Sequence, residues 1–436
     1  MSIRDVVDEL VATSQRQPLP SLTPREIELP LLPGKVDVVT GMRRVGKTYF
    51  LFQSMAERLR DGIEPERLLY LNFEDERLMP MEAADLHHVP EALQRRHPAL
   101  HDREVWLFLD ELQVVPGWER FVRRLIDGGG YRLVVTGSSA RLLASEIPTS
   151  LRGRSLTTEL LPFSFGEFLR HSGEEVPTKW PPPARDRSRL EAALSRYLEV
   201  GGFPEVHGLP EPARVRVLQE YVDVTLLRDV IERHDVRNVS ALRSLVRRLV
   251  RNPASALSVH RLYNDMRSQG FSVSKDTLYA LIGHLEDAHL LHLVSLDTGS
   301  ERRRMANPRK AYLADHSLAV AHSLRAGRDV AHLLENVVHA ELRRRGFAVS
   351  YALTEDGCEV DFVAREARGD AELIQVCADM TSERARQREA RALAAAMRET
   401  GGQRATIVTV AEAGELALPL GRVPVVPAWR WLLEPR

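Results

Sequence analysis

The chain has 436 residues, of which 44% are hydrophobic and 28% are charged, and its formal net charge at pH 7 is −1. This is the composition of a globular protein, and the length predicts roughly two to four domains. Because the molecule carries no overall basic excess, any affinity for nucleic acid must come from local patches. The two cysteines, Cys358 and Cys377, exclude a disulfide framework and a multi-cysteine metal site. The polar start and the lack of a long apolar run predict a cytoplasmic protein without a membrane span.

A glycine-punctuated segment from Gly41 to Thr48 lies between two apolar runs. It reads Gly-Met-Arg-Arg-Val-Gly-Lys-Thr and fits the phosphate-binding loop G-x-x-x-x-G-K-[ST]. The glycines let backbone N–H groups face inward around phosphates, the lysine reaches the β- and γ-phosphates, and the threonine hydroxyl joins the Mg²⁺ shell. The residues predicted to bind ATP are Gly41, Arg44, Val45, Gly46, Lys47, Thr48 and Tyr49.

A second apolar run, Val105 to Leu109, ends in Asp110 and Glu111. Such runs are typical of strands buried on both faces, and open α/β sheets bind their ligands at the carboxyl ends of the strands. We therefore expect Asp110 to support Mg²⁺ and Glu111 to orient and deprotonate the attacking water. Taken alone, the two carboxylates could also cap a helix.

Two later segments add candidates for the same site. The predicted strand 132–136 is followed by Ser138 and Ser139, either of which could contact the γ-phosphate or the attacking water, or instead cap the next helix. Arg152 and Arg154 could stabilise transition-state charge, in their own chain or in a neighbouring subunit, or could be solvated surface charges.

Residues 239–325 change to short helices followed by two predicted strands, an order typical of a winged helix-turn-helix. The basic segment between the strands would form a wing tip that contacts DNA phosphates. The residues predicted to contact DNA are Arg302, Arg303, Arg304, Arg309 and Lys310. The alternative is a scaffold or dimerisation module with a solvated wing.

Together these motifs resemble a family of prokaryotic P-loop ATPases of the AAA+ superfamily, which pair the ATPase with a C-terminal domain of the type DUF4143. Further segments that carry the resemblance are Leu-Asn-Phe-Glu-Asp (71–75), Thr-Gly-Ser-Ser (136–139), Leu-Arg-Gly-Arg (151–154), Pro-Phe-Ser-Phe-Gly-Glu-Phe-Leu (162–169) and Gly-Gly-Phe-Pro-Glu (201–205). The resemblance implies an α/β fold with four parts. These are a parallel-sheet ATPase core (1–172), a helical region that closes it (173–238), the winged helix (239–325) and a nuclease-like α/β domain of the PD-(D/E)XK type (326–436).

The nuclease-like domain departs from the pattern that the resemblance implies for active members. Those hold Mg²⁺ with a helix acid, a strand aspartate and a third-strand acid, followed two residues later by a lysine. Glu335 and Asp361 stand at the first two positions, but the third strand carries Gln375 and Cys377. An amide is a weaker metal ligand than a carboxylate, and a thiol supplies no ammonium. No lysine follows Lys310 in the sequence, so we expect a catalytically degenerate domain.

The sequence therefore predicts a Mg²⁺-dependent ATPase that hydrolyses ATP to ADP and phosphate and couples this to DNA binding or remodelling through its later domains. Two alternatives stay open: a nucleotide-gated DNA-binding regulator with slow hydrolysis, and an ATP-coupled nuclease. The oligomeric state, including a homo-oligomer, and the choice between DNA and protein as the coupled partner are open as well.

Overall fold

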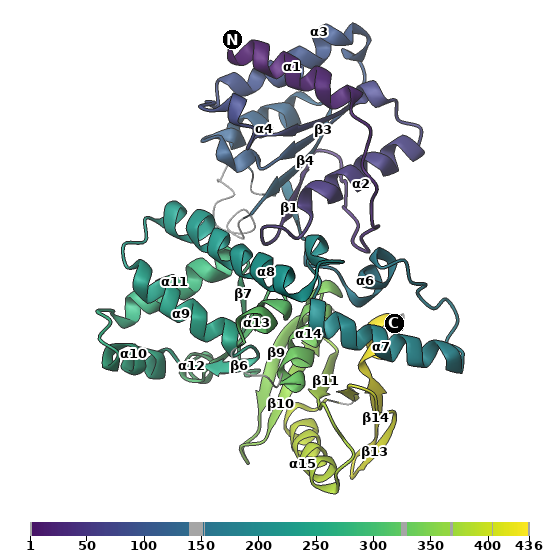
Figure 1. The fold of residues 1–436 in the computed structure, drawn as a ribbon, viewed down its shortest axis with the longest axis vertical. Helices are drawn as coiled ribbons and strands as arrows, with labels where there is room; N and C mark the ends of the chain where they lie inside the picture. Colours follow the sequence, from purple (N-terminus) through teal and green to yellow (C-terminus); the bar gives the residue numbers. More distant parts are fainter. Residues whose placement is uncertain are drawn as a thin grey trace. The chain divides into compact units, whose positions relative to one another are not determined.

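The computed structural model describes residues 2–138, 151, 153–323, 329–366, 369–402 and 404–434. It forms two compact units, which Figure 1 draws in the colours of the sequence. The first unit comprises Met1–Leu160 with Asp287–His289, and the second comprises Leu161–Glu286 with Leu290–Arg436. Apart from Asp287–His289, the predicted helical, middle and C-terminal regions all lie in the second unit, and the predicted boundaries between the four parts stay a prediction.

The first unit is built on a five-stranded, wholly parallel sheet, which confirms the predicted α/β class. The strand order is β2-β3-β4-β1-β5. Because the strands run in one direction, their carboxyl ends meet at a single edge of the sheet. The strands are β1 (Val36–Thr40), β2 (Leu68–Asn72), β3 (Val105–Asp110), β4 (Tyr131–Gly137) and β5 (Ser155–Glu159).

Helices enclose this sheet, and their sequences explain their bounds. Helix α1 begins after Ser2, whose side chain forms a reciprocal capping box with Asp5, and its buried valines and leucine pack towards α3 and β2. The buried face of α4 includes Trp118 and Phe121. The helices are α1 (Ile3–Arg16), α2 (Lys47–Arg60), α3 (His88–Arg96) and α4 (Trp118–Gly128). Short 3₁₀ turns lie between them: η1 (Pro65–Arg67), η2 (Glu76–Leu78), η3 (Asp85–His87), η4 (Pro98–Leu100) and η5 (Leu112–Val114).

The second unit opens with helices around the Gly-Gly-Phe-Pro turn. A Cβ on Gly202 would lie 2.6 Å from the carbonyl oxygen of Phe163, and the Gly202 N–H donates to the Asp315 carboxylate at 2.9 Å. Only glycine fits this close approach, which accounts for the motif by packing alone. The elements are α6 (Phe165–His171), α7 (Ala184–Val200), η6 (Pro204–Val206), α8 (Glu211–Thr225), the π-helical turn η7 (Leu226–Glu232) and α13 (Ser317–His322).

The middle region contains four helices, the last of them only six residues long, and a small antiparallel sheet of order β6-β8-β7. The three longer helices and the last two strands follow the predicted order, strand β6 is an additional element, and the identification as a winged helix stays a prediction. The expected wing tip is the short helix α12 rather than an open loop. The elements are α9 (Val239–Arg251), β6 (Ser255–Leu257), α10 (Val259–Ser268), α11 (Lys275–Asp287), β7 (Leu291–Val294), α12 (Glu301–Ala306) and β8 (Arg309–Leu313).

The C-terminal region is a mixed six-stranded sheet of order β13-β14-β12-β11-β10-β9. Helix α14 contacts β9, β10 and β11, and α15 contacts β10, β11 and β13 (Figure 1). Its elements are α14 (Val330–Arg344), β9 (Ala348–Leu353), β10 (Glu359–Arg365), β11 (Ala371–Val376), α15 (Glu383–Thr400), β12 (Arg404–Thr409), β13 (Gly414–Leu418), β14 (Gly421–Pro427) and α16 (Ala428–Leu433). In the described part of the chain, no helix combines the length and the apolar character needed to cross a bilayer.

Candidate functional site

The predicted phosphate loop joins β1 to α2 at the carboxyl edge of the first sheet. Gly41 has φ +150°, and a Cβ there would lie 2.3 Å from the carbonyl oxygen of Leu160, so the turn requires glycine. Gly46 caps α2 with φ +97°, and Arg44 also adopts a positive φ, +70°. The curled loop therefore ends at the amino terminus of α2, where backbone N–H groups and the helix dipole favour an anion.

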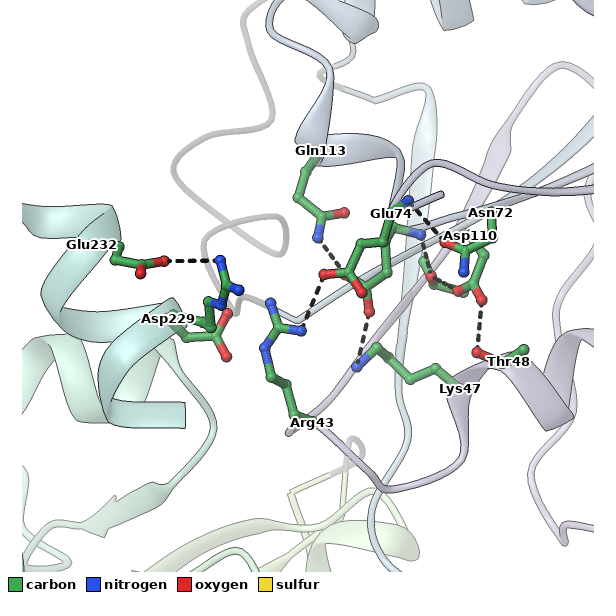
Figure 2. A network of polar contacts seen from close by, with 12 residues as sticks. Arg43, Lys47, Thr48, Asn72, Glu74, Asp110, Gln113, Asp229 and Glu232 are labelled. Carbon is green, nitrogen blue, oxygen red and sulfur yellow. Dashed lines mark hydrogen bonds and ion pairs between the residues drawn. The ribbon is translucent and has the colours of Figure 1, made fainter. Parts of the chain in front are cut away.

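Lys47 is the first residue of α2, and its ammonium lies inside the loop. Its Nζ donates to the carbonyl oxygens of Gly41 at 3.2 Å and Met42 at 3.4 Å. The same nitrogen lies 3.5 Å from Oε1 of Glu111, with both side chains largely buried. Figure 2 shows the Lys47 nitrogen directed towards the carboxylate that also accepts from Gln113. The lysine charge is thus compensated by the predicted base.

Asp110, the last residue of β3, is buried and accepts three side-chain hydrogen bonds. Thr48 Oγ1 donates to it at 2.6 Å and Tyr70 Oη at 3.0 Å, and Thr136 Oγ1 donates to its other oxygen. Burial raises the pKa of Asp110, and the three hydroxyl donors oppose that rise. The sequence predicted Thr48 and Asp110 here, but it did not single out Tyr70 or Thr136.

The pairing of Thr48 with Asp110 also fits a magnesium ion. Hydroxyl and carboxylate oxygens are the hard ligands that Mg²⁺ takes, and both lie beside the phosphate loop. These two residues are therefore the ones that could hold the ion.

Glu111 is held in a single position from several sides. Its φ is +53°, and its backbone N–H donates to Thr136 Oγ1 at 2.9 Å. Gln113 Nε2 donates to its carboxylate at 2.5 Å. Burial favours a raised pKa for Glu111, but the Lys47 charge, the Gln113 hydrogen bond and the Arg43 charge outweigh it and lower the pKa. The carboxyl group is consequently ionised, as a general base must be.

A second ion pair lies at the same edge. Arg43 Nη1 lies 3.1 Å from Oε1 of Glu74, and the Glu74 N–H donates to Oδ1 of Asn72 at 2.9 Å (Figure 2). Asn72 ends β2 and lies beside Asp110 in the sheet register. The ends of β2 and β3 and the phosphate loop thus share one polar cluster, although sequence reasoning left Asn72, Glu74 and Arg43 without a role there.

The loop is supported from behind by a residue that no motif indicated. Arg25 is buried, and its Nη1 donates to the carbonyl oxygen of Val45 at 2.9 Å. Gln53 of α2 holds the Arg25 backbone N–H at 2.7 Å. Tyr49, which was predicted to contact the nucleotide, is 55% exposed in the first turn of α2.

The remaining predicted site residues fall in different places. Ser138 is buried directly after β4, at the same edge as Asp110. Its predicted sensor role stays a prediction. Ser139 and Arg152 lie outside the described residues.

Arg154 lies at the opposite edge of the sheet. Its carbonyl oxygen accepts from the N–H of Val36 at the start of β1, and its guanidinium pairs with Asp127 near the end of α4. A five-residue strand spans about 16 Å, which separates Arg154 from the phosphate loop of its own chain. The predicted action of Arg154 in its own chain is therefore contradicted by its position, and an action on a neighbouring subunit stays a prediction.

The basic residues predicted to bind DNA divide into two groups. Arg302 and Arg303 are exposed on α12, while Arg304 pairs with Glu301 at 2.7 Å. Arg309 lies 3.8 Å from Glu286.

The prediction for Lys310 is wrong, because its side chain is only 5% exposed and is enclosed by carboxylates. Its Nζ lies 2.8 Å from Glu335, 2.7 Å from Glu359 and 3.0 Å from Asp361. No lysine follows Lys310 in the sequence, but Lys310 itself reaches the nuclease-like site. The lysine comes from β8, before the expected start of that domain. The carboxylates raise the pKa of Lys310 against the opposing effect of its burial, so the ammonium is charged.

Two family models match the chain. Residues 33–169 match a family described as an AAA domain, and residues 191–329 match a domain of unknown function, DUF8612. The C-terminal type DUF4143 that the sequence resembles is not shown by these matches.

The chain is also similar to two uncharacterized proteins. MJ1544 of Methanocaldococcus jannaschii is 34% identical over 419 residues, which cover 94% of this chain and 90% of that protein. A protein of Haemophilus influenzae is 30% identical over 334 residues, covering 76% of this chain and 80% of its own length. Among solved structures, the Walker-type ATPase PABY2304 of Pyrococcus abyssi has 13% identity and a TM-score of 0.39, covering 73% of this chain and 95% of that one. With a TM-score below 0.5, that likeness carries no inference about the present chain.

Proposed function

Because this chain belongs to the same family as MJ1544 and carries an AAA domain at residues 33–169, we propose that it is a Mg²⁺-dependent ATPase that hydrolyses ATP to ADP and phosphate. The observation that carries the proposal is the meeting of Lys47, Asp110 and an ionised Glu111 at one edge of a parallel sheet. Nucleotide hydrolysis in general follows from the AAA domain, and the metal dependence and the residue roles are the proposed part.

The phosphates would lie on the N–H groups between Gly41 and Thr48, with Lys47 at the β- and γ-phosphates. Mg²⁺, held by Thr48 and Asp110, would neutralise charge on the phosphate oxygens when bound. Glu111 would accept a proton from the attacking water, with Gln113 fixing its carboxylate. Since Lys47 lies against Glu111, an arriving phosphate competes with that carboxylate for the ammonium. Binding of ATP would thereby release the base.

We also propose that residues 239–325 form a winged helix and that residues 326–436 adopt a PD-(D/E)XK nuclease-like fold. The support is the element order: α9-β6-α10-α11-β7-α12-β8 in the first, and α14-β9-β10-β11-α15-β12 in the second. DNA would be contacted through Arg302 and Arg303, which are exposed on α12.

A nucleotide-gated regulator with slow hydrolysis is a second candidate. The ion pair between Lys47 and Glu111 favours it, because a base that must first be released gives a low basal rate.

The test is the steady-state ATPase rate of the full chain with and without single- and double-stranded DNA. Stimulation by DNA that is lost in Arg302→Ala/Arg303→Ala supports coupled hydrolysis. The matched control is Arg185→Ala, which removes a guanidinium that is 87% exposed on α7. The nucleotide-gated regulator is supported by two results together. The ATPase rate is slow and unchanged by DNA, and the affinity for DNA depends on the bound nucleotide. If the wild type does not hydrolyse ATP, or if Glu111→Gln hydrolyses ATP as fast as the wild type, the proposed ATPase function is contradicted.

A further inference from the structure

The ammonium of Lys310 lies at the centre of three carboxylates in the second unit. Its distances to oxygens of Glu335, Glu359 and Asp361 are 2.8, 2.7 and 3.0 Å. We infer that Lys310 is a built-in cation that takes the place of a divalent metal ion, so that this centre binds no metal ion. This goes beyond the proposed ATPase activity, which belongs to the first unit.

Lys310 belongs to strand β8, which neighbouring elements hold in place. Strand β8 pairs with both β6 and β7 and is attached to α14 through Asn336, whose side chain accepts from the Leu313 N–H at 2.8 Å and donates to the Leu313 carbonyl at 3.0 Å. Tyr312 lies two residues further along β8, on the same face of the strand as Lys310, and its Oη also donates to Glu335, at 2.7 Å. Because β8 is held on both sides, Lys310 has little freedom to leave the carboxylates.

Carboxylate oxygens are the ligands that divalent cations take, and here oxygens of three carboxylates surround an ammonium instead. An ammonium at hydrogen-bond distance from all three fills the space between them, and its positive charge repels a second cation at that position. In this chain the charge that an ion would supply is already supplied by the protein.

The other potential ligands are turned to the backbone. Oδ2 of Asp361 accepts from the N–H of Val376 at 2.9 Å, and Oε1 of Gln375 accepts from the N–H of Asp361 at 3.2 Å. Gln375, which replaces the third acid, therefore joins β10 to β11 rather than facing an ion.

Solvent ions can nevertheless approach this centre. A cleft of about 640 Å³ is lined by Glu359, Asp361 and Gln375 on one side and by residues of α15, among them Arg384 and Arg388, on the other. If Lys310 were removed, a metal ion could thus reach Glu359 and Asp361, which line the cleft. The Lys310 ammonium, rather than a lack of access from solvent, is therefore what excludes a metal ion from this centre.

The test compares Mn²⁺ binding by the full-length wild type and by Lys310→Met, without nucleotide, using electron paramagnetic resonance of free Mn²⁺. Lys310→Met should gain one Mn²⁺ site that the wild type lacks, because an ammonium no longer repels the ion. The double variant Lys310→Met/Asp361→Asn should lose the new site. Mn²⁺ bound at the ATPase centre is common to all three proteins and cancels in the comparison.

Two results would overturn the inference: Mn²⁺ binding by the wild type that Asp361→Asn removes, or a folded Lys310→Met that gains no site. If Lys310→Met does not fold, the melting temperatures of the wild type and of Asp361→Asn decide. We expect Mn²⁺ to shift both equally, and a Mn²⁺-dependent rise seen only in the wild type would show that the lysine leaves room for a metal.

Discussion

Replacing Glu111 with Gln should tighten ATP binding while it slows hydrolysis. Glutamine keeps the size of the side chain but removes the negative charge that lies 3.5 Å from the Lys47 ammonium. In the proposed mechanism, ATP competes with Glu111 for this ammonium in the wild type. In the variant the ammonium has only the neutral amide and the carbonyl oxygens of Gly41 and Met42. The two effects therefore have opposite signs, which a simple loss of folding would not produce.

The size of the first effect follows from the distance between the two charges. Unit charges 3.5 Å apart interact by about 5 kcal/mol at an effective dielectric constant of about 20. Most of this is offset by hydration and relaxation, and a hydrogen bond to a charged group contributes a net of about 1.5 kcal/mol at the low end of its range. We expect ATP to bind about tenfold more tightly. Loss of a general base should lower the turnover number by about 10²- to 10⁴-fold.

The assay pairs the affinity for a fluorescent ATP analogue, from equilibrium titration, with phosphate release at saturating ATP. The matched control is Glu74→Gln, which removes a half-exposed carboxylate at the same edge that pairs with Arg43 rather than with Lys47. A surface pair of this kind contributes less than about 1 kcal/mol, so both of its constants should stay within about fivefold of the wild type. Unchanged turnover in Glu111→Gln, or weaker ATP binding, would refute the assigned competition for Lys47.

Three further changes test other contacts. Lys47→Ala should abolish tight ATP binding without unfolding the chain, as seen by titration beside circular dichroism, and retained micromolar affinity would count against the phosphate loop. Gln113→Leu should leave the KM for ATP nearly unchanged and lower kcat about tenfold, because the hydrogen bond that positions Glu111 is lost and the activation free energy rises by about 1.4 kcal/mol. A change confined to KM would contradict that role. Gly202→Ala should lower the melting temperature measurably, because the new Cβ would lie 2.6 Å from the carbonyl oxygen of Phe163. Such a clash costs about 1–3 kcal/mol of folding free energy. A variant as stable as the wild type would show that the turn can relax.

Local signals allowed the phosphate loop and the strand that ends in Asp110 to be predicted. The glycine spacing and the continuous apolar run are both contained within a few residues, and parallel strands bring their carboxyl ends together. The hydroxyl groups of Tyr70 and Thr136 could not be found in this way. Their contact with Asp110 depends on the pairing of β2 and β4 with β3, and no residue near them in the sequence indicates it.

The errors have physical reasons as well. Strand β5 reads Ser-Leu-Thr-Thr-Glu, a short and half-polar edge strand that the sequence did not indicate, and without it the position of Arg154 at the amino edge could not be seen. Lys310 was assigned to a solvated wing because its neighbours in sequence are arginines. Its carboxylate partners Glu335 and Asp361 come 25 and 51 residues later, and only the attachment of β8 to α14 brings them together.

That attachment also determines where the chain can be cut. A fragment that begins at residue 326, the boundary suggested by the sequence, would contain Glu335 and Asp361 without the strand that neutralises them. Burial and mutual repulsion already raise the pKa of Glu335 to about 7 in the intact chain, despite the nearby ammonium. Deprived of β8, the same carboxylates would have to take up protons or cations from solution in order to stay buried. A fragment that keeps Glu335 and Asp361 beside their cationic partner must therefore begin before Arg309, so that it includes β8.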